Sequence, residues 1–209
     1  MVIAVDGPAA SGKGTISKSL AKHFDLPHMD TGLLYRAVAL SLFRFGGDPG
    51  NPFEARRAVE ALEQIDMDDA ELRTETVGEI ASRVSAYPGV RTALLERQKA
   101  FAAQDGGAVL DGRDIGTVIA PEATAKLFVT ASPERRAERR CAELRGRGLD
   151  VHYEDVLIDI RARDERDAGR ESAPLLQATD ADLLDTSEMT IERAVRRAIA
   201  LVEARLPAS

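Results

Sequence analysis

The sequence has few of the side chains that build disulfides and metal sites. Its 209 residues include one cysteine, Cys141, and three histidines, His23, His28 and His152. A single cysteine cannot form an intrachain disulfide, which favours a reducing compartment or no redox role. The histidines have no carboxylate or metal-ligand spacing around them, so we expect structural or surface roles for all three. We also expect no direct metal ligand from the protein and a buried Cys141 within a helix.

The sequence also lacks a net positive charge and a long apolar run. Its 28 Lys and Arg against 35 Asp and Glu give a formal net charge of −7, which argues against general binding to nucleic acids or anionic membranes. The apolar run at 37–43 is far shorter than the roughly 20 residues of a membrane span. Residues 1–6 show no basic region followed by an apolar stretch. We expect a cytoplasmic, globular monomer with neither a nucleic-acid nor a membrane partner.

Short β-branched runs and helical patterns alternate along the chain. Strands are predicted at 2–5, 26–29, 108–110, 125–129 and 182–184. Helices are predicted at 15–24, 32–45, 53–62, 74–85, 90–104, 134–145, 153–167 and 191–206. This alternation predicts an α/β fold, with a five-stranded parallel sheet and helices on both faces.

Two segments depart from that alternation. Residues 32–105 contain no convincing strand after their first helix, which predicts a helical lobe inserted into a single domain spanning 1–209. Residues 146–175 are rich in both charges, which predicts a mobile flap. We find no internal repeat and no low-complexity tract, so the lobe and the flap belong to one globular domain.

The strongest motif lies between the first predicted strand and the first predicted helix. It reads Gly7, Pro8, Ala9, Ala10, Ser11, Gly12, Lys13, Gly14 and Thr15. In this context, glycines let backbone N–H groups converge on phosphate oxygens, and the helix N-terminus adds its positive end. We expect a phosphate-binding loop in which Lys13 reaches the β- and γ-phosphates. The alternative is a strand–turn–helix unit that is merely rich in glycine.

Polar residues also follow the second predicted strand. Thr31 begins a helix pattern there, and Arg36 lies in the first turns of that helix. A helix N-terminus together with an arginine makes a second anion site. The alternative is a capped helix with an exposed arginine.

The third predicted strand ends in another polar segment. Asp111 stands where a Walker-B-like carboxylate would orient water bound to Mg²⁺, and Arg113 and Asp114 follow. These residues project from the carboxyl edge of the sheet, where ligands bind in α/β proteins. A polar loop with a turn glycine is the alternative.

Arginines gather in the predicted flap. Arg163, Asp167 and Arg170 are spaced i, i+4 and i+7, which places them on one face of a helix. Arginines in an acidic protein can clamp a phosphoryl group during its transfer. A solvated helix with many ion pairs is the alternative.

Taken together, these segments resemble the bacterial cytidylate kinases, a family of nucleoside monophosphate kinases. The resemblance runs from residue 2 to about residue 187. It rests on GPAASGKGT at 7–15, MDTGLLYR at 29–36, ASRVSAYPGVR at 81–91, LDGRDIGTV at 110–118, RARDERDAGR at 161–170 and LLDTS at 183–187. The first motif indicates only a P-loop kinase, whereas DGRDIGTV combined with the spaced arginines at 163–170 is far more specific.

The resemblance implies a P-loop NTP hydrolase-like fold and phosphoryl transfer from ATP to CMP or dCMP. Residues 7–15 would bind ATP, and Mg²⁺ would be held mainly by phosphates and water, because Gly14 stands where other P-loops have Ser or Thr. The implied substrate-binding residues are Thr31, Arg36 and Arg113 for the phosphate end, Ser82, Arg91 and Asp114 for cytosine, and Arg163 and Asp167 for ribose. Lys13, Arg113, Arg163 and Arg170 would be catalytic, by neutralising charge on the transferred group.

Residues 63–80 depart from the family pattern. Many members carry a longer insert with a small extra sheet there, whereas this stretch is short and acidic. We therefore expect a small, helical monophosphate-binding lobe. Two other functions remain open at this point: a P-loop kinase for another monophosphate or an alcohol such as shikimate, and a nucleotide-binding switch that transfers nothing.

Overall fold

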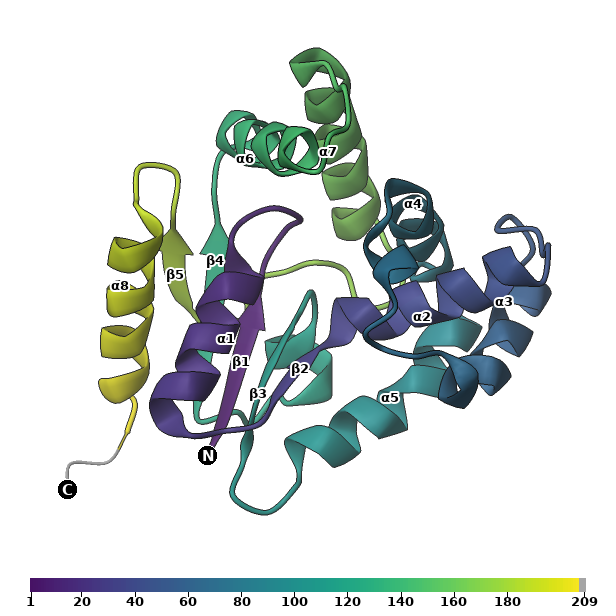
Figure 1. Cartoon of the computed structure of the whole chain (residues 1–209). Helices are drawn as coiled ribbons and strands as arrows, with labels where there is room; N and C mark the ends of the chain where they lie inside the picture. Colours follow the sequence, from purple (N-terminus) through teal and green to yellow (C-terminus); the bar gives the residue numbers. More distant parts are fainter. Residues whose placement is uncertain (207–209) are drawn as a thin grey trace. The chain divides into compact units, whose positions relative to one another are not determined.

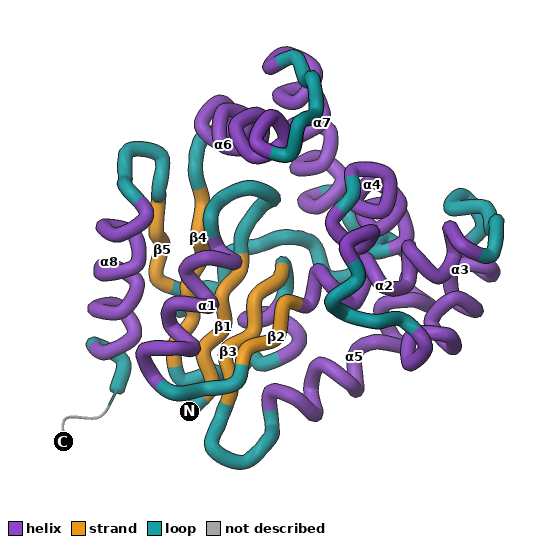
Figure 2. The backbone as a smooth tube through the Cα atoms, viewed as in Figure 1, coloured by secondary structure: helices purple, strands orange, loops and turns teal. Residues whose placement is uncertain are grey.

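Five parallel strands form a single sheet. The computed structural model describes residues 1–206, and its sheet has the order β2-β3-β1-β4-β5 (Figures 1 and 2). The strands are β1 (Val2–Asp6), β2 (His28–Asp30), β3 (Ala108–Gly112), β4 (Ala125–Thr130) and β5 (Asp182–Asp185). Strand β1 pairs in parallel with β3 and β4, and β4 pairs in parallel with β5. The predicted α/β class with a five-stranded parallel sheet is confirmed.

Each predicted helix has a counterpart whose ends differ by a few residues. The helices are α1 (Lys13–Phe24), α2 (Thr31–Arg44), α3 (Pro52–Ala58), α4 (Glu75–Val84), α5 (Pro88–Ala102), α6 (Pro133–Gly146), α7 (Tyr153–Ala168) and α8 (Ile191–Glu203). The prediction of one helix over 53–62 is wrong, since α3 passes into a 3₁₀ helix at Val59–Gln64; such tightening is common at helix ends. A second 3₁₀ helix at Ala70–Arg73 and a π-helical turn at Ile115–Ile119 have no predicted counterpart.

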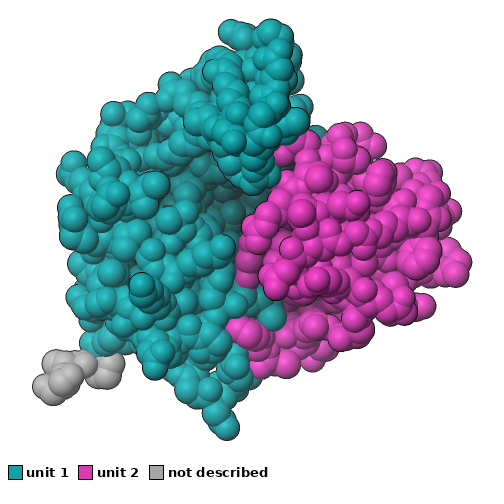
Figure 3. Space-filling model, in the orientation of Figure 1, with its two compact units in different colours: residues 1–29, 102–209 teal, residues 30–101 magenta. Residues whose placement is uncertain are grey.

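The chain divides into two compact units (Figure 3). The first unit holds residues 1–29 and the chain from 102 onward, and it contains most of the sheet. The second unit, residues 30–101, contains α2 to α4, both 3₁₀ helices and most of α5. Residues 52–105 contain helices and turns without a strand, as expected. The expected lobe at 32–105 overlaps this second unit, and its role in binding a monophosphate stays a prediction.

The core of the first unit lies between the sheet and two helices. Ile3 and Val5 of β1 pack in one cluster with Leu20 of α1 and Val202 of α8. Ala4 points to the opposite face of the sheet, because side chains alternate along a strand, and it is fully buried too. Both faces of the sheet are therefore covered, as the apolar character of its strands requires.

Helices α6 and α7 form a second, smaller core. Cys141 and Leu144 of α6 pack with Val156 and Ile160 of α7. The expectation of a buried Cys141 is therefore confirmed. Helix α7 lies within the charged segment 146–175, so apolar contacts hold part of this segment against α6, and the mobility of the segment stays a prediction. Within residues 1–206, no helix is both long enough and apolar enough to cross a membrane.

Two neighbouring leucines of β5 test how much the sheet core contributes to stability. Leu184 is buried in the core cluster, whereas Leu183 faces solvent with 56% of its surface exposed. We expect Leu184→Ala to lower the free energy of unfolding by about 2–5 kcal/mol, because it leaves a cavity. Leu183→Ala, the matched control, should cost about 0.5 kcal/mol or less. Urea unfolding of both variants measures this difference, and equal losses would contradict the assigned core.

Candidate active site

The phosphate loop is shaped by close backbone approaches that require glycine. A Cβ atom on Gly7 would lie 2.0 Å from the carbonyl oxygen of Val129, and the φ angle of Gly7 is +154°. Gly12 has a φ of +91° and directly precedes α1, which has no side-chain cap at its N-terminus. The first N–H groups of α1 are therefore not capped by a side chain, which is the arrangement that binds anions.

Side chains from α6 and from the segment after β5 bind the carbonyl groups of this loop. Arg136 donates to the carbonyl of Ala9 at 3.3 Å. Arg139 donates to the carbonyl of Ser11 at 3.3 Å, and the Thr186 hydroxyl lies 3.0 Å from the same oxygen. These three contacts fix the two carbonyl groups and use none of the loop's N–H groups, the groups that bind phosphate in such loops.

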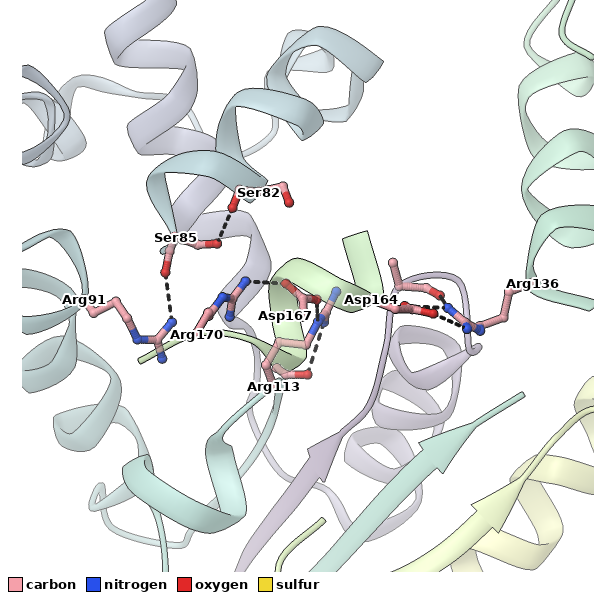
Figure 4. A network of polar contacts seen from close by, with 10 residues as sticks. Ser82, Ser85, Arg91, Arg113, Arg136, Asp164, Asp167 and Arg170 are labelled. Carbon is pink, nitrogen blue, oxygen red and sulfur yellow. Dashed lines mark hydrogen bonds and ion pairs between the residues drawn. The ribbon is translucent and has the colours of Figure 1, made fainter. Parts of the chain in front are cut away.

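Arg136 is itself held by an acidic partner. Its guanidinium group makes a bidentate contact with Asp164 of α7, with N–O distances of 2.9 and 2.5 Å (Figure 4). Arg136 is almost completely buried, whereas Asp164 is partly exposed. A bidentate arginine–carboxylate pair fixes both position and orientation. The phosphate loop is thus connected through Arg136 to α7, the helix that carries Arg163.

Asp167 joins two of the predicted phosphate-binding arginines. It accepts a hydrogen bond from Nε of Arg113 at 2.7 Å and another from Arg170 (Figure 4). The prediction that Arg163, Asp167 and Arg170 share one helical face is wrong for Arg170, because α7 ends at Ala168. Arg170 reaches Asp167 from the turn that follows the helix. The structure thus brings Arg113, Asp167 and Arg170 together.

The charge of Asp167 is balanced by its neighbours. Burial by itself would raise the pKa of Asp167, but the guanidinium groups of Arg113, Arg170 and Arg163 together hold it below its ordinary value. The carboxylate therefore stays ionised, and three arginines around one carboxylate leave an excess of positive charge. Such an excess attracts an anion such as a phosphate group.

The turn after β3 presents Arg113 and Asp114. Asp114 is buried and directly precedes the π-helical turn Ile115–Ile119. The carboxylate of Asp6, the last residue of β1, accepts hydrogen bonds from the backbone N–H groups of Ile115 and Gly116, each at 2.8 Å. These residues lie in the first unit, as do the phosphate loop, Asp167 and Arg170.

In the second unit, Arg36 is held by backbone carbonyls. It donates to the carbonyls of Leu72 at 2.7 Å and Thr74 at 3.1 Å. Asp30 caps the N-terminus of α2 by accepting from the N–H of Leu33. This cap agrees with the alternative interpretation of the segment, in which the helix start is capped and is not an open anion site. Thr31, the first residue of α2, is buried.

The residues predicted to recognise the base in the second unit are buried and interconnected. Arg91 donates to the carbonyl of Ser85 at 3.3 Å, and the Ser85 hydroxyl donates to the carbonyl of Ser82 at 3.0 Å (Figure 4). The Arg91 guanidinium also lies 5.6 Å from the ring centroid of Tyr35, within the range of a cation–π contact. These contacts orient the guanidinium group of Arg91 within this unit.

Comparison with known sequences identifies the family. A profile of the cytidylate kinase family matches residues 3–204. A cytidylate kinase of Xanthobacter autotrophicus is 61% identical over 207 residues, which cover 98% of this chain and 98% of that one. A cytidylate kinase of a Methylobacterium species is 58% identical over 207 residues, which cover 99% of each chain. The chain belongs to the cytidylate kinase family.

Solved structures resemble this member of the cytidylate kinase family in fold alone. An uncharacterised protein from Eubacterium ventriosum superposes with a TM-score of 0.59 at 12% identity, over 98% of this chain and 99% of that one. A protein from Thermus thermophilus superposes with a TM-score of 0.51 at 21% identity, over 100% and 98% of the two chains.

The structure gives one histidine of this cytidylate kinase family member a partner that no sequence spacing indicated. A structural or surface role was expected for His28, and its Nε2 lies 2.8 Å from the carboxylate of Asp111, with both side chains largely buried. The two residues are 83 positions apart, so only the pairing of strands brings them together. His23 lies on the surface, 3.4 Å from Glu203.

Sequence reasoning also missed the side chains that support this family member's phosphate loop and the turn after β3. They are Asp6, Arg136, Arg139 and Thr186. Thr186 lies within the LLDTS motif, which was the available signal for it. Asp6 and the α6 arginines carry no local pattern, because their partners are more than 100 residues away.

The buried carboxyl group of Asp6 makes a prediction about stability and pH. Burial raises its pKa from 3.8 to about 7, opposed by the hydrogen bonds from Gly116 and Ile115; Asp114 raises the pKa further and Arg113 lowers it. Because the folded-state pKa lies above the unfolded value, this group stabilises the fold most below pH 4. That contribution is lost as the pH rises toward 7.

We therefore expect Asp6→Asn, which cannot ionise, to remove this part of the pH dependence. The difference in unfolding free energy, variant minus unsubstituted protein, should rise by about 2–3 kcal/mol between pH 5 and pH 8. Urea unfolding at several pH values measures that difference, in which the other titrating groups cancel. A difference that stays constant across this range would contradict the raised pKa.

Proposed function

We propose that this protein transfers the γ-phosphoryl group of ATP to CMP or dCMP, producing ADP and CDP or dCDP. The observation that carries the proposal is a second positively charged cluster, which lies in the same unit as the phosphate loop. Arg113 and Arg170 converge on the buried Asp167 in the same unit that builds the phosphate loop. A nucleotide-binding switch needs only the loop, whereas a kinase also needs groups that bind an acceptor phosphate.

The donor side of the proposed reaction is residues 7–15. ATP would place its phosphates against the uncapped N-terminus of α1, where the backbone N–H groups and Lys13 supply positive charge. The contacts from Arg136, Arg139 and Thr186 to the loop carbonyls support this proposal, because they hold the loop in shape without using its N–H groups.

The acceptor side of the proposal consists of the residues that the family resemblance implies. Arg36 and Arg113 would bind the phosphate of CMP together with Thr31, and Arg163 and Asp167 would contact the ribose. Ser82, Arg91 and Asp114 would recognise cytosine. Cytosine has an amino donor at N4 and acceptors at N3 and O2, and the three side chains complement it, since Asp114 accepts, Arg91 donates and Ser82 does either.

The reaction needs no general base. The second pKa of a phosphate monoester is about 6, so the attacking oxygen is already ionised at neutral pH. Catalysis then depends on positioning and on neutralising the charge that develops on the transferred group. Lys13, Arg113, Arg163 and Arg170 would supply that neutralisation, and the lowering of the pKa of Asp167 by Arg113, Arg170 and Arg163 against the effect of its burial supports this proposal.

Mg²⁺ fits this site as an ion held by phosphates and water. Within residues 1–206, the structure contains no group of three or more His, Cys, Asp or Glu side chains that could ligate a metal. Mg²⁺ keeps several waters in nucleotide sites, so a dedicated protein cage is not needed. Asp111, fixed by its contact with His28, would orient water on the ion. The bound ion would supply further neutralisation of the phosphate charge.

Closure of the flap would complete the proposed site. Water must be excluded so that ATP is not hydrolysed, and segments that close over substrates perform this task in many enzymes. The segment 146–175 carries Arg163 and Arg170, so ordering of this segment would bring both arginines to the phosphates. The mobile flap, the monomeric state and the cytoplasmic location stay predictions.

Lys13 provides the first test of the proposed reaction. Lys13→Met should lower kcat by on the order of 100-fold or more, because the ammonium group follows the phosphates into the transition state. Lys18→Met, on the exposed side of the same helix, is the matched control and should leave kcat unchanged. A coupled assay of ADP production measures both variants. Near-normal turnover by a folded Lys13→Met protein would exclude the assigned role.

The choice of base provides the second test. Across CMP, dCMP, UMP, AMP, GMP and shikimate, we expect efficient transfer to CMP and dCMP. UMP should be a poor acceptor, because its O4 would face the acceptor-only carboxylate of Asp114. Asp114→Asn should narrow the kcat/KM ratio of CMP over UMP, mainly through loss of CMP. An unchanged ratio would show that Asp114 does not recognise the base, and transfer to none of the acceptors would rule out the proposed kinase.

A further inference from the structure

Asp6 is a buried carboxylate that the proposed reaction does not use. It is the last residue of β1, directly precedes Gly7 of the phosphate loop, and has only 5% of its surface exposed. One of its oxygens accepts from the N–H of Ile115 and the other from the N–H of Gly116, each at 2.8 Å. A single side chain thus binds two consecutive amides that are about half the chain away in sequence.

The two amides that Asp6 binds directly follow Arg113 and Asp114 in the sequence. The parallel pairing of β1 with β3 ends where Asp6 stands opposite Gly112. Arg113 and Asp114 therefore lie just beyond the last residue pair of this ladder. The side chain of Asp6 then binds the N–H groups of Ile115 and Gly116. Arg113 and Asp114 are therefore held on one side by the β1–β3 pairing and on the other by the Asp6 carboxylate.

The π-helical turn that follows depends on the same carboxylate. Asp114 stands at the N-terminus of this turn but makes no side-chain cap there. The amides of Ile115 and Gly116 are instead satisfied by Asp6, and a buried amide without such a partner would be costly. A Cβ atom at Gly116 would lie 3.4 Å from Oδ2 of Asp6, an ordinary contact distance, so the contact depends on the carboxylate and not on the absence of a side chain at residue 116.

We propose that Asp6 is a positioning residue that fixes Arg113 and Asp114 relative to the phosphate loop, so that one carboxylate sets the geometry between the donor and acceptor groups of the kinase. This inference rests on the proposed roles of Arg113 and Asp114 in binding CMP. It predicts an asymmetric effect of substitution. Without the Asp6 carboxylate, Arg113 and Asp114 are no longer fixed. The phosphate loop keeps its contacts with Arg136, Arg139 and Thr186.

The charge of Asp6 makes the asymmetry measurable. A carboxylate next to a triphosphate-binding loop repels its ligand, so a neutral side chain at this position does not weaken ATP binding through charge. Loss of the two hydrogen bonds, in contrast, weakens CMP binding. A change that only loosened the fold would weaken the binding of both nucleotides.

The experiment measures the dissociation constants of CMP and of ATP separately, by calorimetry at pH 8, together with kcat and KM for each nucleotide. Asp6→Asn keeps one acceptor oxygen, and we expect it to raise the CMP constant by about 3- to 10-fold; Asp6→Ala removes both acceptors and should raise it by about 10-fold or more. The ATP constant should stay the same or fall in both variants. Asp182→Asn, which loses a surface contact with Arg205, is the matched control and should change neither constant.

A third variant covers the case in which neither Asp6→Asn nor Asp6→Ala folds. Asp6→Glu keeps the carboxylate but lengthens its side chain by one methylene group, which shifts the oxygens from the amides of Ile115 and Gly116; we expect a rise in the CMP constant of a few fold with an unchanged ATP constant. Equal weakening of both nucleotides, or an unchanged CMP constant in the folded variants, would overturn the proposal.

Two variants separate this inference from the proposed function. Arg113→Lys and Asp114→Asn should themselves weaken CMP binding. If they do so while the Asp6 variants do not, the positioning role is overturned and the acceptor site stands. If neither of them changes CMP binding, the assigned acceptor residues are wrong and the positioning role falls with them.

Discussion

The ion-pair cluster around Asp167 is the interaction on which the charged part of the first unit depends. Arginines that bind phosphate repel one another in the absence of a ligand, and burying them unpaired would be costly. Asp167 offsets this repulsion between Arg113, Arg163 and Arg170, and its lowered pKa reflects their combined charge. Because Arg113 follows β3 and Arg170 follows α7, the same contact connects the edge of the sheet with the end of a helix.

Other carboxylates hold arginines or backbone amides in position elsewhere in the first unit. Asp164 holds Arg136, which in turn contacts the phosphate loop, and Asp6 holds the amides that follow Arg113 and Asp114. A site for two nucleotides needs donors that are already in place, since orienting them during the reaction would cost part of the binding energy. Carboxylates that hold these donors meet this need, which reconciles the net acidic chain with a site for anions.

Several features of this protein could be predicted because they depend on local sequence. The apolar and β-branched runs determined the five strands, and the glycines at 7 and 12 determined the phosphate loop, since no other residue suits those backbone positions. The motifs at 110–118 and 161–170 pointed to the cytidylate kinase family, and the match over residues 3–204 bears this out. Helix ends and the division of the 53–62 segment were less predictable, because they depend on tertiary packing.

The tertiary structure alone decided how the charged groups are paired. From the sequence, Arg170 belonged to a helical face, His28 had no acidic neighbour, and Asp6 was only the end of a strand. In the structure, Arg170 lies beyond α7, His28 contacts Asp111, and Asp6 binds amides more than 100 residues away. Local propensity and glycine geometry act over a few residues and can be read along the chain. Ion pairs and buried hydrogen bonds depend on which strands lie side by side, and that is settled only when the sheet forms.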